Sequence, residues 1–137
     1  MYLGQLTDDH KKLFLDAAIY LSMSDGNFAL NEKNMIDQMC REMQIPARYE
    51  MELGGDALLS MFTGISSERQ KRIILVELGG IVLADQVYDA KEKEMLCVIA
   101  RSLGYPESVA DEAVALVEEL YGLYVRMERF LESKSAK

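Results

Sequence analysis

The chain has 137 residues, of which 50% are apolar and 28% are charged. This length suits one domain around one hydrophobic core, and the composition is that of a folded globular protein. A formal net charge of −8 argues against a nucleic-acid partner, because an acidic surface repels phosphates. The charge favours cations or basic protein surfaces instead.

Hydropathy and cysteine content also limit the class of protein. The longest apolar run, residues 73–84, is interrupted by Glu77 and is shorter than the roughly 20 residues of a membrane span. No N-terminal stretch pairs a basic region with an apolar run, so we expect no signal peptide. Cys40 and Cys97 are expected to be reduced core thiols. Together these features predict a cytoplasmic protein without a membrane span.

Helix signals dominate the first third of the chain, and no run alternates like a strand. Thr7 is the expected N-cap of a helix that runs to about residue 24, with acids in its first turn. A second helix is expected from about residue 30 to residue 43, before Pro46.

The remaining elements are also predicted to be helical. Residues 47–65 should hold one or two short helices, broken near a pair of glycines. Ser66 is the expected cap of a strong helix that ends near residue 84. A further helix is expected at 90–103, and Pro106 should open a long last helix to about residue 131.

The chain also repeats itself at a shift of 60 residues, with 16–46 lying on 76–106. Six pairs are identical: Asp25/Asp85, Glu32/Glu92, Lys33/Lys93, Met35/Met95, Arg41/Arg101 and Pro46/Pro106. We therefore predict an all-α compact bundle of about six to seven helices, built by internal duplication of a helix–turn–helix unit. Residues 1–132 should form this single domain, with 133–137 as a disordered tail.

The stretch "SDGNFALNEK", residues 24–33, begins a candidate metal site. Asp25 continues the apolar stripe of the preceding helix, and Glu32 starts the stripe of the next. Asp85 and Glu92 occupy the same places in the second copy. If the two units pack with approximate two-fold symmetry, the four carboxylates converge and offer oxygen ligands suited to calcium, magnesium or manganese.

A structural interpretation of the same acids stays open. Asp89 and Glu92 match a capping box, and Asp25 and Asp85 could hold their turns as side-chain caps. In that case the acids would also pair internally with the repeated arginines Arg41 and Arg101.

Glu77 lies in the most apolar helix and should be buried. A buried carboxylate must be paired, bound to a cation or protonated. We expect an ion pair with Arg41, Arg101 or Arg72, and keep Glu77 as a tentative metal ligand. The neighbouring Gly79 and Gly80 should let another helix approach closely. Asp16, in contrast, is expected to be solvated.

No motif indicates catalysis, so we expect a protein that is not an enzyme. His10 is the only histidine and is expected at the surface; no nucleophile motif accompanies it. In the last helix, most of a periodic apolar set should be core: Val109, Ala113, Leu116, Val117, Leu120, Tyr124, Met127 and Leu131. Tyr121 and Phe130 exceed what one core needs and are candidate contacts for a dimer or another protein.

The motif pair "LSMSDGNFALNEKNMI" and "IVLADQVYDAKEKEML" resembles the tellurite-resistance TerB family, which includes domains related to those of DnaJ-like co-chaperones. The resemblance covers about residues 6–131 and rests on an acid seven places after the turn aspartate, found twice. It departs from the pattern at Gln86 and Ala29. It implies an all-helical duplicated domain, an acidic patch suspected of binding metal ions, and a role in stress response.

Two functions follow as hypotheses. The first is a non-catalytic, stress-related domain that binds a divalent cation through the acids at the two turns. The alternative is a pure protein–protein interaction module, in which those acids serve as caps and internal ion-pair partners.

Overall fold

The computed structural model describes residues 1–23, 30–83 and 90–134 of the chain. Over these residues the chain forms helices only, which confirms the all-α prediction and the expected size of the bundle. In chain order the elements are η1 (Leu3–Gln5), α1 (Asp8–Ser22), α2 (Leu30–Met43), α3 (Gly55–Thr63), α4 (Glu68–Val82), α5 (Ala90–Ser102) and α6 (Glu107–Glu132).

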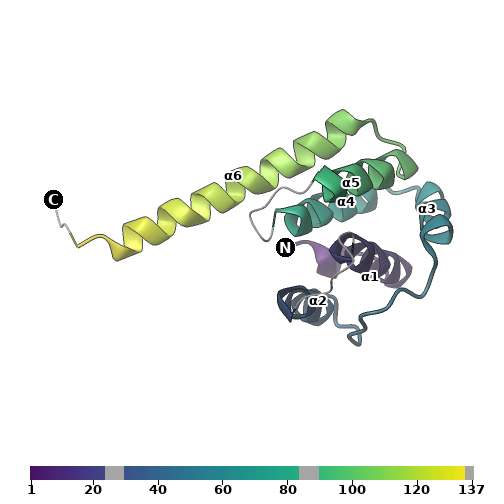
Figure 1. Cartoon of the computed structure of the whole chain (residues 1–137), viewed down its shortest axis with the longest axis horizontal. Helices are drawn as coiled ribbons and strands as arrows, with labels where there is room; N and C mark the ends of the chain where they lie inside the picture. Colours follow the sequence, from purple (N-terminus) through teal and green to yellow (C-terminus); the bar gives the residue numbers. More distant parts are fainter. Residues whose placement is uncertain (24–29, 84–89, 135–137) are drawn as a thin grey trace.

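Helices α1 and α4 pack against each other at the centre (Figure 1). Helices α2 and α3 lie against α1, α5 and α6 lie against α4, and α3 also contacts α5. The central pair contributes many of the fully buried side chains, among them Phe14 and Leu15 of α1 and Ile74 and Leu78 of α4. Both central helices are therefore covered on nearly every side.

Local capping signals set several helix starts. The Thr7 hydroxyl accepts a hydrogen bond from the His10 backbone N–H at 3.2 Å, as predicted. Ser66 was expected to cap α4, but the cap is Ser67. The Ser67 hydroxyl accepts a hydrogen bond from the Gln70 backbone N–H, three residues later, as an N-cap does. Pro106 is the N-cap of α6, one place before its expected position.

Asp16 corrects the expectation of a solvated residue. It is only 2% exposed and accepts hydrogen bonds from Arg48 Nη1 at 2.6 Å and from the backbone N–H groups of Glu52 and Leu53. The expectation was wrong because the irregular segment 44–54 covers the side of α1 that carries Asp16. The carboxylate fastens that segment. Of the one or two short helices expected in residues 47–65, the structure forms one, α3.

The helix bounds agree with the predicted 60-residue shift. Helix α1 begins and ends 60 residues before α4, and α2 begins 60 residues before α5. Equivalent places are buried in both halves, for example Phe14/Ile74 and Ile36/Leu96. The internal duplication itself stays a prediction.

The first half of α6 lies close against α4. A Cβ atom on Gly79 would be 3.7 Å from backbone atoms of Ala113 and Val114, as expected for a glycine at a close helix contact. The second half projects away from the other helices (Figure 1), and every residue from Gly122 to Glu132 is exposed. We call residues 122–132 the arm and the rest of the described chain the body.

Candidate functional site

The acids predicted at the two turns are only partly described. Glu32 is half-buried in the first turn of α2, and Glu92 is buried in the first turn of α5. Asp25 and Asp85 lie outside the described residues. Within the described part of the chain, no three His, Cys, Asp or Glu side chains are grouped so that they could hold a metal ion. The four-carboxylate site therefore stays a prediction.

Glu77 is buried, as expected, but its partner is not an arginine. Its Oε1 accepts a hydrogen bond from the Tyr2 backbone N–H at 2.9 Å and lies 3.3 Å from the Met1 amino nitrogen. Glu42 holds the same amino group at 2.8 Å. Burial lowers the pKa of that amine, but the bonds to Glu42 and the attraction of Glu77 outweigh it and raise the pKa overall. Glu77 thus anchors the segment before α1.

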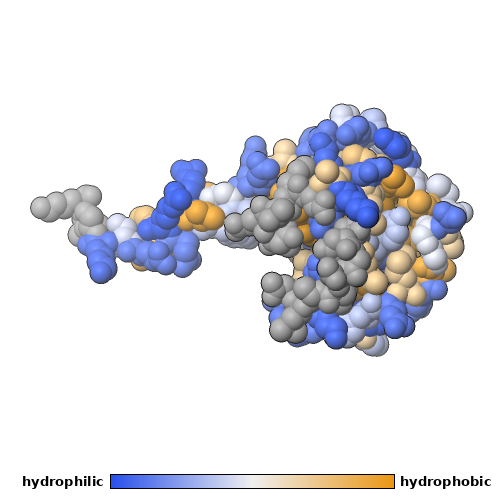
Figure 2. Space-filling model, in the orientation of Figure 1, coloured by the Kyte–Doolittle hydropathy of each residue, from blue (hydrophilic) through white to orange (hydrophobic). Residues whose placement is uncertain are grey.

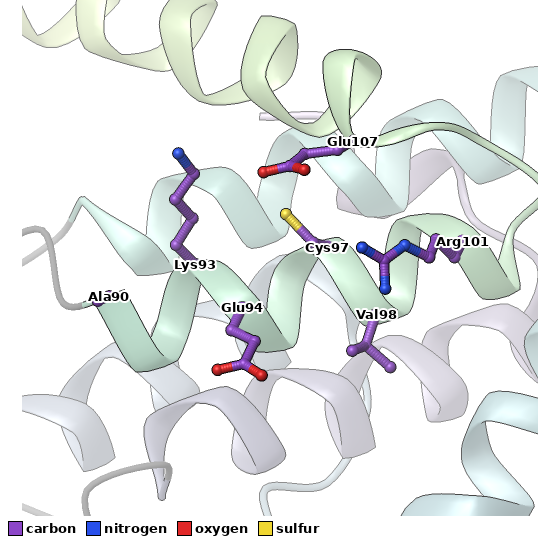
Figure 3. A pocket seen from close by; sticks show the side chains of 7 residues that line it. All are labelled: Ala90, Lys93, Glu94, Cys97, Val98, Arg101 and Glu107. Carbon is purple, nitrogen blue, oxygen red and sulfur yellow. The ribbon is translucent and has the colours of Figure 1, made fainter.

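A hollow of about 310 Å³ lies between α5 and the start of α6. Figure 3 shows Cys97 of α5 directed towards Glu107 of α6, with Lys93 and Arg101 beside them. Burial raises the pKa of the Cys97 thiol, and the nearby charges of Glu107 and Asp111 raise it further. A thiol held protonated in this way is a poor nucleophile. Cys97 and Cys40 are both free and buried, as predicted.

A second hollow, of about 540 Å³, lies beside the segment that Asp16 fastens. The Lys33 ammonium lies 5.1 Å from the centre of the Tyr49 ring, and the Tyr49 hydroxyl donates to Asp37. His10, at the other end of α1, is hydrogen-bonded through Nδ1 to Gln70 Oε1 at 2.9 Å. These polar groups are engaged with one another and hold the loop and helix ends in place.

The arm is the feature that the sequence pattern did not place correctly. Leu116, which precedes the arm, was expected in the core and is exposed because it lies on the side of α6 away from the body. In the arm itself, Tyr124, Met127 and Leu131 were expected in the core and are exposed too. The reason in the arm is length. Helix α6 has 26 residues and α4 has 15, so at about 1.5 Å per residue α6 extends past the end of the helix it packs on.

The two predicted contact residues differ in position. Tyr121 is half-buried, and its hydroxyl donates to the Gly80 carbonyl at 3.3 Å, so it joins the arm to the body. Phe130 is 79% exposed near the tip of the arm. Leu123, Val125 and Met127 were not singled out as contacts from the sequence, although they are exposed too. The signal that could have found them is the breadth of the apolar surface on α6, which exceeds one core-facing stripe.

The arm is therefore the strongest candidate site among the described residues. Figure 2 shows apolar residues interspersed with charged ones along this projection. Many large apolar side chains exposed on one element mark a site of protein or membrane contact. Among the helices that the structure describes, none is long and apolar enough to cross a membrane.

Comparisons with known proteins add no assignment. No protein-family model, no curated protein and no solved structure matches the chain. The resemblance to the TerB family stays a prediction from the motif pair.

Proposed function

We propose that this chain is a non-catalytic helical module that binds protein through the arm. The observation that carries the proposal is the exposed apolar surface of the arm. Its large apolar residues include Leu123, Tyr124, Met127, Phe130 and Leu131, each at least 45% exposed. A helix of about three turns has little stability of its own in water, so a partner on this face would both bind it and stabilise it.

The described hollows support a binding role over a catalytic one. The thiol at the α5–α6 hollow has a raised pKa, and the histidine is hydrogen-bonded at the far end of α1. Neither places an activated nucleophile beside a base, which is what covalent catalysis requires.

The cation hypothesis and the stress-response role stay predictions. The first needs Asp25 and Asp85, and the described acids Glu32 and Glu92 each have interactions within the chain. For this reason the arm, rather than the turns, is put forward as the functional element.

Photo-crosslinking in cells that express the full chain tests the proposal. A photoreactive phenylalanine analogue replaces Tyr124 on the arm in one variant and the exposed Ser60 of α3 in the other. We expect protein adducts from position 124 that disappear when Leu123→Lys is added. Equal yields of adduct from both positions would rule out the arm as the binding element.

A further inference from the structure

Helix α6 carries an apolar stripe with the spacing of a coiled-coil seam, which begins on the body and continues along the arm. Leu116, Leu120, Leu123, Met127 and Phe130 follow one another at intervals of four, three, four and three residues. This is the alternation by which two helices pack side by side. Most of the stripe is exposed: Leu116 is 53% exposed although the helix still lies on the body at that point.

This stripe is not the face that α6 uses for its own core. The residues buried against the body are Ala110, Ala113, Val114 and Val117. At 100° per residue, their mean direction is about 110° around the helix from that of the stripe. A second helix can therefore lie along the stripe while α4 and α5 keep their contacts with α6.

Charge indicates what kind of partner fits. Residues 1–121 hold 21 acidic and 11 basic side chains, whereas the arm, residues 122–132, holds two of each. The arm is thus a neutral projection from a strongly acidic body. The arms of two copies can therefore meet without the repulsion that two acidic bodies exert on each other.

We propose, on the basis of the function proposed above, that the partner of the arm is a second copy of this chain, packed antiparallel along the stripe. An antiparallel pair centred between residues 121 and 122 places Leu120 opposite Leu123 and Leu116 opposite Met127 of the other copy. The same register brings Arg126 close to Glu119 of the other copy, because both residues lie on the same flank of the stripe. A parallel pair would instead set both acidic bodies at the same end, where they repel each other.

The area available is at the lower limit for a stable dimer. The five residues of the stripe, with Tyr124 and Leu131 beside them, are seven large apolar side chains per copy. Burying their exposed surface removes on the order of 1,100 Å² from water across the pair. The pair should therefore form reversibly as the concentration of the chain rises through the micromolar range.

Sedimentation equilibrium of the full chain tests the pairing. The chain concentration runs from about 1 to about 500 µM, a range that covers the roughly micromolar dissociation constant expected for this area. We expect the mass to rise from 15.5 kDa towards twice that value. Leu123→Lys, on the stripe, should abolish the rise. Val125→Lys adds the same charge at an exposed apolar residue on the opposite side of the helix, and should dimerise like the wild type. Circular dichroism confirms that both variants stay helical.

A charge exchange tests the antiparallel direction. Arg126→Glu alone should weaken dimerisation at least tenfold, and Glu119→Arg/Arg126→Glu should restore it. No recovery in the double variant would overturn the antiparallel arrangement.

The outcomes separate this inference from the function proposed above. If the wild type keeps the mass of one chain up to about 500 µM, the upper end of the range chosen for the expected affinity, the partner is not a second copy. Crosslinks from position 124 to a different protein would then leave the arm as the binding element. A dimer that Leu123→Lys does not dissociate overturns the role of the stripe.

Discussion

The two halves of α6 have similar apolar spacing and different surroundings. Ala113 and Val117 are buried where the helix lies on the body, and Phe130 and Leu131 are exposed where it extends past it. Periodicity marks which residues share a face of a helix. Whether that face becomes core depends on a neighbouring helix, and α4 ends before the arm begins.

This difference implies that the body and the arm respond differently to the same substitution. In the body, a lost side chain leaves a cavity or an unpaired polar group. In the arm of a single chain, the same loss removes only surface that is already in contact with water. The following variants compare the two regions at concentrations where the chain is monomeric.

The largest effect is expected for Phe14→Ala. Phe14 is fully buried at the centre of α1, and removing a buried phenylalanine costs about 3–5 kcal/mol through lost burial and the cavity that remains. Phe130→Ala makes the same change in the arm and should alter stability by less than about 0.5 kcal/mol. Urea unfolding measures both. A similar loss in the two variants would mean that the arm packs on the body.

Asp16→Ala should have the next largest effect, a loss of roughly 3 kcal/mol. The substitution leaves the Arg48 guanidinium and two backbone N–H groups without their buried acceptor. Glu52→Gln is the control, because Glu52 pairs with the same arginine but is largely exposed, and such a pair is worth about 0–1 kcal/mol. Equal losses would show that Asp16 does not fasten the segment.

Two glycines of opposite surroundings provide a third comparison. Gly79→Leu inserts a side chain where backbone atoms of α6 lie 3.7 Å from a Cβ, and should cost about 2 kcal/mol by forcing α4 and α6 apart. Gly122→Leu meets open space, with nothing within 4 Å of an added Cβ. It should raise the helix content by circular dichroism, because glycine is a poor helix former. Destabilisation by Gly122→Leu would contradict the exposed position of the arm.

The smallest effect is expected at the junction of the two regions. Tyr121→Phe removes the hydrogen bond to Gly80 and should cost about 1 kcal/mol. Burial raises the pKa of Tyr121, and the charges of Glu77 and Tyr124 raise it further. The contribution of the neutral phenol is thus present below the unfolded-state pKa of about 10 and is lost as pH rises through the folded-state pKa.

Unfolding at pH 8 and at about pH 10.5, just above the ordinary tyrosine pKa, measures this contribution. The wild type should lose more stability over that interval than Tyr121→Phe. Tyr124→Phe, at an exposed tyrosine, should behave like the wild type. Identical pH dependence in the wild type and Tyr121→Phe would remove Tyr121 as a link between arm and body.

Local signals were sufficient to predict the helices. Thr7 caps α1 through a bond three residues away, and the stripe around Phe14 reports the face that is buried. What the sequence could not supply is the arrangement of distant segments. Asp16 is buried because residues 44–54 fold over α1. Its place within the apolar run "LFLDAAIYL" was the only signal in the sequence that this side of the helix is covered.

The candidate site was predicted only in part, for the same reason. Phe130 was expected to be free for a partner and is exposed, whereas Tyr121 turns back to Gly80. The pairing of Glu77 with the Met1 amino group joins residues 76 positions apart, a distance over which spacing carries no information. The turn acids Asp25 and Asp85 lie outside the described residues.

The continuity of α6 has a consequence for its backbone. The amide groups near Ala113 exchange with solvent only when the packed helices separate, whereas those near Met127 need only the local fraying of a helix end. Hydrogen exchange rates should therefore rise steeply along one unbroken helix after about Tyr121. Amides before Tyr121 would then exchange only through global unfolding, and amides after it through local fraying.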